Sequence, residues 1–167
     1  RTSNVRSAKS IAFLAISAIG VAMLCVPVTA MSARLVWNFT PSIPTGLYWI
    51  EDRTWRKGDR VAVTPSGSLL TALQRAGVLE NGRVLMKRVV ALAGDEVCRS
   101  GSQVSVNGFE VATARPDENL PTWSGCVRLQ PGQIFLLGET TDSFDGRYFG
   151  VTSSEDIVGP VQLLQPF

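Results

Sequence analysis

The sequence of 167 residues contains no histidine. A Ser–His–Asp triad or a Cys–His pair within this chain is therefore excluded, because both use an imidazole as the general base. The three cysteines, Cys25, Cys98 and Cys126, are too few and too scattered for a zinc cluster. We expect no metal ion and no cofactor. If a serine of this chain is a nucleophile, its base is another side chain, and lysine is the best-attested substitute.

Acidic residues are missing from the first part of the chain, where Arg1, Arg6 and Lys9 precede a long apolar segment. Beyond Ser32 the remaining thirteen basic residues face all fourteen acidic ones, so this part is close to neutral. No basic face for nucleic acid is predicted. An apolar content of 45% with 18% charged residues fits one globular domain with one membrane element.

The segment 11–31 carries no charge. At a rise of about 1.5 Å per residue a helix of this length spans about 30 Å, the thickness of a bilayer core. The basic flank predicts residues 1–10 in the cytoplasm, a retained transmembrane anchor at 11–31 and a periplasmic domain at 32–167. The alternative is a cleaved signal peptide with Val28-Thr29-Ala30 as cleavage site, but an apolar core of about 7–15 residues is usual there. Cys25 is then simply a small apolar residue of the segment.

Short alternating runs indicate a mainly β domain with one helix. A helix is predicted at 68–79 from apolar residues at helical spacing. Asn107-Gly108, between two alternating runs, is typical of a type I′ hairpin. Strands are predicted at 46–51, 60–63, 83–92 and 133–137, with a last one at 157–164 that Gly159-Pro160 interrupts. Loops are predicted at 112–125 and 138–150.

Cys98 and Cys126 bracket the hairpin and the loop that follows it, as a module at 98–126. Outside the cytoplasm we expect these two cysteines to form a disulfide that ties the module back to the sheet.

Lys87 is a cation within an apolar row. Strand alternation places it on the same face as Leu85, Val89 and Ala91, and Arg88 on the opposite face. One interpretation is a snorkelling lysine on a half-exposed strand. The other is a buried amine whose pKa is lowered by desolvation, so that it serves as a base near neutral pH.

Ser42 stands between Pro41 and Pro44, whose restricted backbone gives the hydroxyl a preset direction. The stretch 38–50 can be a stiff membrane-exit linker or part of an active site. The stretch 138–150, GETTDSFDGRYFG, can be a surface loop or a weak calcium loop, although its spacing is wrong for a calcium-binding hand.

Three segments together resemble the type I signal peptidases: PSIPTG, LMKRVVALAGDEV and FLLGETTDSFDGRYFGVTSSEDIVGPV. The resemblance implies a fold of coiled antiparallel β-sheets. Ser42-Ile43-Pro44 replaces the general Ser-Met-x-Pro pattern and, after Asn38, resembles the conjugative-transfer branch of TraF type. That branch matures pilin precursors, some by joining the new end to the N-terminus of the pilin. Glu139-Thr140 and Gly146 depart from the family pattern, and we expect these departures to affect turn geometry rather than chemistry.

The resemblance also implies roles for individual residues. Ser42 resembles the nucleophile and Lys87 the general base. Thr40 stands where the family often has a hydroxyl that donates to the oxyanion, together with the amide of Ser42. Ser143 resembles the hydroxyl that orients the lysine, and a supporting pair follows it: Asp145 and Arg147.

The implied function is a membrane-anchored serine endopeptidase with a Ser–Lys dyad. Its expected partners are a precursor protein, such as a pilin, and the lipid bilayer. The acyl-enzyme can be resolved by water or by an amine, and the sequence leaves this choice open. Three alternatives remain: a general signal peptidase, a non-catalytic pilus or secretion assembly factor, and hydrolysis by the carboxylates of Asp142 and Asp145.

Overall fold

The computed structural model describes residues 34–75, 77, 84–116 and 120–167. The predicted anchor at 11–31, Cys25 and the end of the predicted helix lie outside this part of the chain. Within the described residues, no helix is both long and apolar enough to cross a bilayer. Residues 36–167 form one compact unit.

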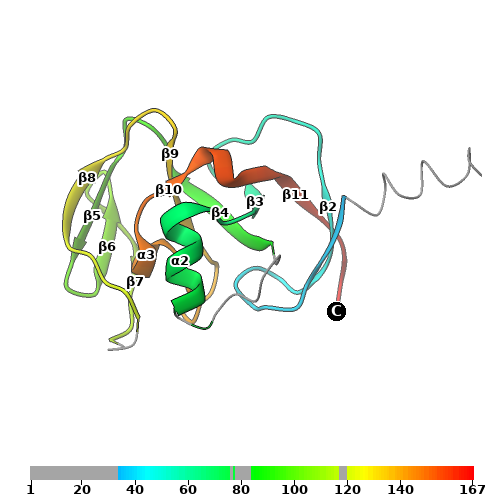
Figure 1. The fold of residues 1–167 in the computed structure, drawn as a ribbon, viewed down its shortest axis with the longest axis horizontal. Coiled ribbons are helices and arrows are strands. Elements are labelled where there is room, and N and C mark those ends of the chain that lie inside the picture. The colour runs from blue at the N-terminus through cyan, green and yellow to red at the C-terminus, as the bar shows by residue number, and fades with distance from the viewer. Residues whose placement is uncertain (1–33, 76, 78–83, 117–119) are drawn as a thin grey trace, which may run out of the picture. The chain divides into compact units, whose positions relative to one another are not determined.

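Two antiparallel sheets make up most of this unit (Figure 1), and the predicted mainly β class is confirmed. The larger sheet has seven strands. In spatial order they are β1 (Leu35–Asn38), β2 (Gly46–Ile50), β11 (Ile157–Pro166), β3 (Arg60–Val63), β4 (Leu85–Ala91), β9 (Gln133–Leu137) and β10 (Thr152–Ser153). Because β2 and β11 are far apart in the sequence, this ladder joins the two ends of the domain.

The last strand, β11, is continuous, so the predicted interruption at Gly159-Pro160 is wrong. Pro160 pairs with Val61 of β3, and the pairing with β2 begins one residue later. The strand therefore changes partners at the residue that has no N–H to donate. Gly159 suits this crossing, since a Cβ there would lie 3.0 Å from the side chain of Ile50, a contact that a small shift of Ile50 would relieve.

The strand β4 lies between β3 and β9 and carries Lys87 into the interior. Val89 packs in the cluster that contains the helix side chains, as the alternation predicts for the Lys87 face. Ala91 instead packs in another cluster, because the register against β9 shifts between Val89 and Ala91. Met86, on the opposite face, is buried as well. Lys87 itself is 4% exposed, so the interpretation as a snorkelling lysine is wrong, although the side chain of Arg88 on the opposite face is 40% exposed.

The smaller sheet has four strands. In spatial order they are β7 (Phe109–Thr113), β6 (Gln103–Val106), β5 (Glu96–Ser100) and β8 (Gly125–Arg128). The predicted hairpin is confirmed: Asn107 and Gly108, between β6 and β7, have φ of 51° and 82°, as a type I′ turn requires. The first two residues of the loop predicted at 112–125 continue β7, and its last residue, Gly125, begins β8, a strand that was not predicted.

The structure contains the disulfide between Cys98 and Cys126. These residues are direct partners in the β5–β8 ladder. The bond therefore joins two neighbouring strands within the module, whereas the expectation from the sequence is a tie between the module and the rest of the sheet.

Two short helices flank the larger sheet. The helix α2 (Gly67–Arg75) covers one face through Leu69 and Leu73. The helix α3 (Gly146–Phe149) lies within the stretch predicted as a loop. Its N-cap is Asp145, whose carboxylate accepts from the amide of Arg147. A single helical turn is too short to give a periodic pattern.

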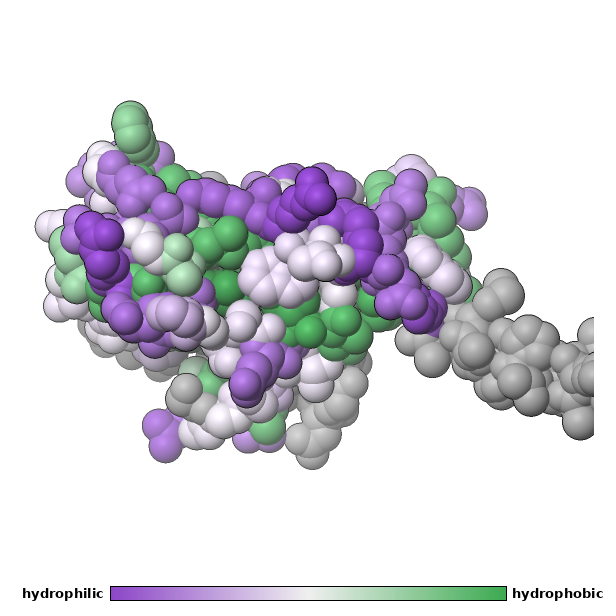
Figure 2. Space-filling view, turned by 90° about the horizontal axis from the view of Figure 1, so that it is seen from above, coloured by the Kyte–Doolittle hydropathy of each residue, from purple (hydrophilic) through white to green (hydrophobic). Residues whose placement is uncertain are grey.

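Figure 2 shows one face of the protein, on which hydrophilic residues form a broad band and apolar residues show through in smaller groups. Several cations of the domain are paired with acids. Arg53 contacts Asp59, and Lys57 contacts Asp95, each at 2.8 Å. This mixture of charges agrees with the near-neutral balance of the domain.

Candidate active site

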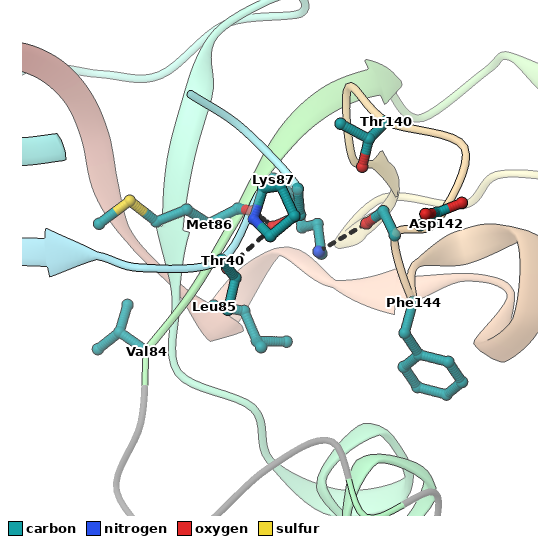
Figure 3. Close-up of a pocket in the computed structure, with 11 residues that line it drawn as sticks. Thr40, Val84, Leu85, Met86, Lys87, Thr140, Asp142 and Phe144 are labelled. Atoms are coloured by element: carbon teal, nitrogen blue, oxygen red, sulfur yellow. Dashed lines mark hydrogen bonds between the residues drawn. The ribbon is translucent and has the colours of Figure 1, made fainter. Parts of the chain in front are cut away.

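A pocket of about 270 Å³ lies between β4, the loop before β2 and the loop after β9. Figure 3 shows it, with Val84, Leu85 and Met86 on one side and Thr140 and Asp142 on the other. The pocket is lined by Thr40, Pro41, Ser42, Val84, Leu85, Met86, Lys87, Thr140, Asp142, Ser143 and Phe144. Three segments that are far apart in the sequence therefore bring Ser42, Lys87 and Ser143 to one cavity.

Ser42 is 7% exposed. Its Oγ lies 3.5 Å from the carbonyl oxygen of Met86 and 3.4 Å from Oγ1 of Thr40. Both contacts are long for hydrogen bonds between oxygen atoms. The backbone is held more firmly, because the carbonyl of Ser42 accepts from the amide of Glu139. The hydroxyl is thus free to turn on a fixed backbone.

Lys87 is 4% exposed and points toward the loop after β9 (Figure 3). Its Nζ donates to Oγ of Ser143 at 2.9 Å. Burial lowers the pKa of Lys87 to about 8; nearby Asp145 opposes this shift and Arg147 adds to it. At this pKa a useful fraction of the amine is neutral near physiological pH. In contrast, Lys57 lies at the surface.

Asp145 and Arg147 form a buried ion pair beside the pocket. Asp145 is fully buried and Arg147 nearly so. Arg147 donates to both carboxylate oxygens, at 2.8 and 2.6 Å, and also to the carbonyls of Thr140 and Thr141. The amide of Gly138 donates to the same carboxylate at 2.7 Å. This network fixes the loop after β9 and so fixes Ser143.

Gly138 allows the close approach of the two loops. A Cβ at this position would lie 2.1 Å from Oγ and 2.4 Å from Cβ of Ser143, and 3.0 Å from the carbonyl oxygen of Ser42. No side chain fits there unless Ser143 moves away. Ser143 could then no longer accept from Lys87.

If the site is that of a serine peptidase, as the sequence resemblance implies, Gly138→Ala should lower cleavage on the order of 10²-fold, as displacement of a positioning group does, and stability by about 1–3 kcal/mol. The measurements are peptide cleavage and urea unfolding. The control is Gly138→Ala combined with Ser143→Gly, which removes the clashing side chain. This double variant should recover stability but not activity. Full activity of Gly138→Ala would contradict the assigned contact.

The carboxylates of Asp142 and Asp145 have different surroundings. Asp142 has a side chain that is 65% exposed and contacts Arg115 at 2.8 Å. Asp145 is fully buried, with both oxygens engaged by Arg147. Two carboxylates that share a reaction need facing positions with free oxygens, so this geometry disfavours a carboxylate pair.

Sequence reasoning missed two contributors to this region. Glu139, expected to affect only turn geometry, accepts from Arg60 at 2.7 and 2.9 Å and from Arg88 at 2.5 Å. It thereby ties the loop after β9 to β3 and β4. The second contributor is Asn38, which in the sequence indicates only the branch of the family. Its side-chain amide donates hydrogen bonds to backbone carbonyls of the loop that carries Ser42. The sequence does contain a hint of this role. Asn38 precedes two prolines that supply no backbone N–H, so a nearby amide side chain is a natural donor for the carbonyls of the loop.

Gly146 is explained by packing. A Cβ there would lie 2.7 Å from the carbonyl oxygen of Leu136 and from the ring of Phe135. A larger residue at this place would not fit without movement of β9.

Comparison with known proteins agrees with the resemblance seen in the sequence. The family model described as "Signal peptidase, peptidase S26" matches residues 6–165. A plasmid transfer protein TraF of Escherichia coli is 35% identical over 137 residues, 72% of this chain and 77% of that protein. A second TraF of Escherichia coli is 33% identical over 153 residues, 83% of this chain and 86% of that protein. Signal peptidase I V of Bacillus subtilis (strain 168) is 25% identical over 127 residues, 65% of this chain and 76% of that protein. The chain belongs to the S26 signal peptidase family, and conjugal-transfer TraF proteins are among its relatives.

Proposed function

We propose that this protein is a serine endopeptidase in which Ser42 is the nucleophile and Lys87 the general base. The observation that carries the proposal is the buried Lys87, whose pKa is lowered to about 8 and whose Nζ is held by Ser143 at the pocket that Ser42 lines. Burying a lysine lowers the stability of a protein. Proteins therefore keep a buried lysine mainly where a reaction needs a neutral amine. Family membership points to the same reaction class.

In the proposed reaction, neutral Lys87 accepts the hydroxyl proton of Ser42 while Oγ attacks the carbonyl carbon of the scissile peptide bond. The lysine ammonium then donates this proton to the leaving nitrogen, the C–N bond breaks, and an ester remains on Ser42. A second nucleophile gives its proton to Lys87 and attacks the ester, and the proton returns to Ser42 as it leaves. The hydroxyl of Ser42 makes only long hydrogen bonds in this structure, so it can rotate toward Lys87 at little cost.

Two hydrogen-bond donors are proposed to stabilise the oxyanion of the tetrahedral intermediate. They are the amide of Ser42 and the hydroxyl of Thr40. Their assignment rests on the resemblance and on the position of Thr40 at the pocket, 3.4 Å from Oγ of Ser42. Loss of one such donor raises the barrier by about 2.7–4 kcal/mol in comparable sites.

The proposed substrate is a membrane-inserted or exported precursor, with a conjugative pilin precursor favoured. Its support is the similarity to TraF proteins over most of the chain. A general signal peptidase is the alternative, supported by the similarity to Signal peptidase I V. A non-catalytic assembly factor is less well supported, because a binding protein has no use for a buried lysine of lowered pKa.

We place the catalytic domain at the periplasmic surface of the inner membrane, with residues 11–31 as its anchor. Trp37, Phe39 and Phe167 support this location. They are 56%, 73% and 62% exposed, and their ring centroids are 5.7–6.3 Å apart. Clustered exposed aromatic rings are typical of a membrane–water interface, and Trp37 follows the predicted anchor by six residues.

The pH dependence of cleavage tests the proposed base. With neutral Lys87 as the working form and a pKa of about 8, kcat/KM should rise about tenfold between pH 7 and pH 9 and then level off. The measurement uses an internally quenched peptide with small residues before the scissile bond, in detergent micelles. Lys57→Gln, which changes the surface lysine, should leave the midpoint unchanged. A flat profile from pH 6 to pH 9 would rule out a lysine base.

The mass of the processed pilin decides between the two fates of the acyl-enzyme. Hydrolysis gives a linear product, whereas attack by the N-terminal amine of the pilin gives a ring that is one water lighter. Ser42→Ala should give neither product.

A further inference from the structure

Asn38 is the last residue of β1, and its buried side chain contacts residues on both sides of Ser42. Its Nδ2 lies 2.9 Å from the carbonyl oxygen of Thr40, 3.1 Å from that of Ile43 and 3.0 Å from that of Pro44. Its Oδ1 accepts from the amide of Thr40 at 3.2 Å and from the hydroxyl of Thr40 at 3.0 Å. Carbonyl oxygens only accept, so these partners determine which end of the amide points where. One side chain thus closes the loop that carries Ser42.

The loop depends on this side chain because its own backbone is poor in donors. Pro41 and Pro44 have no N–H, and buried carbonyls without a donor are unfavourable. Asn38 supplies these donors from one side of the loop. From the other side the amide of Glu139 donates to the carbonyl of Ser42. The backbone of Ser42 is therefore fixed from two directions.

Asn38 also determines how Thr40 can act. The hydroxyl of Thr40 has one hydrogen, which it donates to Oδ1 of Asn38. In the 3.4 Å contact between the two hydroxyls, Thr40 can then only accept, and the single hydrogen of Ser42 is shared between Thr40 and the carbonyl oxygen of Met86. To donate to an oxyanion, Thr40 must exchange its bond to Asn38 for one to the substrate. The strength of the bond to Asn38 thus affects how readily the oxyanion donor becomes available.

We propose that Asn38 is a positioning residue that holds the Ser42 loop in register with Lys87 and keeps Thr40 beside the hydroxyl of Ser42. The proposal rests on the proposed serine peptidase function. It implies an effect on the chemical step rather than on peptide binding, because Asn38 is not among the residues that line the pocket.

The test is Asn38→Leu, which keeps a similar shape and removes both the donor and the acceptor. With the internally quenched peptide, kcat should fall on the order of 10²-fold, as small displacements of reacting groups do, while KM changes by less than about threefold. The pH midpoint set by Lys87 should stay near the wild-type value. Thr40→Val should also lower kcat, and the loss in the double variant should be smaller than the product of the single losses, because the two residues act through one contact.

Asn107→Ala is the matched control for a general loss of stability. Asn107 bonds through its side chain to the amide of Glu96 and to Asp95 in the small sheet, so kcat should not change. Circular dichroism verifies that each variant is folded. If Asn38→Leu does not fold, Asn38→Asp replaces it: this variant keeps the acceptor for Thr40, places an oxygen against the three loop carbonyls, and should also lose kcat.

Wild-type kcat in the folded Asn38 variant, or fully multiplicative losses in the double variant, would overturn the proposal. A lowered kcat with a shifted pH midpoint would also overturn it, because the effect would then act through Lys87. Ser42→Ala is measured in parallel. If Ser42→Ala cleaves the peptide, the peptidase proposal itself fails; if it is inactive while Asn38→Leu has full kcat, only the role of Asn38 is wrong.

Discussion

Replacing Lys87 by methionine should abolish cleavage and at the same time make the protein more stable. Methionine removes the proposed base for Ser42, so kcat/KM should fall on the order of 10³-fold or more. Burial lowers the pKa of Lys87 from 10.5 to about 8, which corresponds to a penalty of about 3 kcal/mol at neutral pH. Methionine has a similar length and no charge. Because Ser143 loses its partner, which costs about 1 kcal/mol, the net gain should be about 1–3 kcal/mol.

The pH dependence of this gain follows from the sign of the shift. The unfolded chain binds the lysine proton up to about pH 10.5, whereas the folded protein releases it near pH 8. Wild-type stability therefore rises between these values as the penalty disappears, and the advantage of Lys87→Met is largest below pH 8. Urea unfolding at pH 7 and pH 10 measures it, and the gain at pH 7 should exceed that at pH 10 by about 2 kcal/mol.

Ser42→Ala separates the two effects of Lys87→Met. It should be equally inactive, but its stability should differ from wild type by less than about 1 kcal/mol, because the Ser42 hydroxyl makes only long hydrogen bonds. A Lys87→Met variant that still cleaves the peptide would exclude Lys87 as the base. An inactive variant without a gain in stability at pH 7 would show that burial does not lower the pKa of Lys87.

Local sequence patterns predicted the elements that depend on neighbouring residues. The strand around Lys87, the Asn107-Gly108 hairpin and the mainly β class all follow from alternation and turn chemistry. The position of Ser143 beside Lys87 was implied by resemblance alone, since the two residues are 56 positions apart and no periodicity connects them. Contacts of this kind depend on how β4 and β9 pair, and strand pairing is not encoded in either strand by itself.

Long-range packing also explains what the sequence did not reveal. The continuous passage of β11 through Pro160 depends on two different partner strands at that residue. The requirement for Gly138 depends on a loop that returns to within contact of it, at Ser143. The network of Asn38 became recognisable only once the carbonyls of the Ser42 loop had positions in space.

The second large effect is expected at the buried ion pair. Asp145→Ala should lower the free energy of unfolding by about 3–5 kcal/mol, because Arg147 then remains buried without a counter-charge. The same change removes the N-cap of α3 and the acceptor for the amide of Gly138. Urea unfolding at pH 7 measures the loss. A loss below about 1 kcal/mol would mean that water or another residue replaces the carboxylate.

Asp145→Asn separates the contribution of the carboxylate charge to stability from that of the N-cap hydrogen bond. The amide oxygen can still cap α3, but Arg147 loses its counter-charge, so a loss of about 2–3 kcal/mol should remain. Combining it with Arg147→Met removes the unpaired cation and should recover part of that loss, as apolar replacement of a buried ion pair does. If the double variant is less stable than Asp145→Asn, the bonds of Arg147 to the loop carbonyls outweigh its charge.

The same variants should move the pH profile of cleavage in opposite directions. The charge of Asp145 raises the pKa of Lys87 and that of Arg147 lowers it. Asp145→Asn removes the anion that favours the ammonium, so the midpoint of the kcat/KM profile should shift below about pH 8. Arg147→Met removes the opposing cation, so its midpoint should shift upward. Variants that lose stability but keep the wild-type midpoint would show that the ion pair supports the loop after β9 without affecting the base. Opposite shifts would show that Asp145 and Arg147 both act on the pKa of Lys87 and that their effects oppose each other.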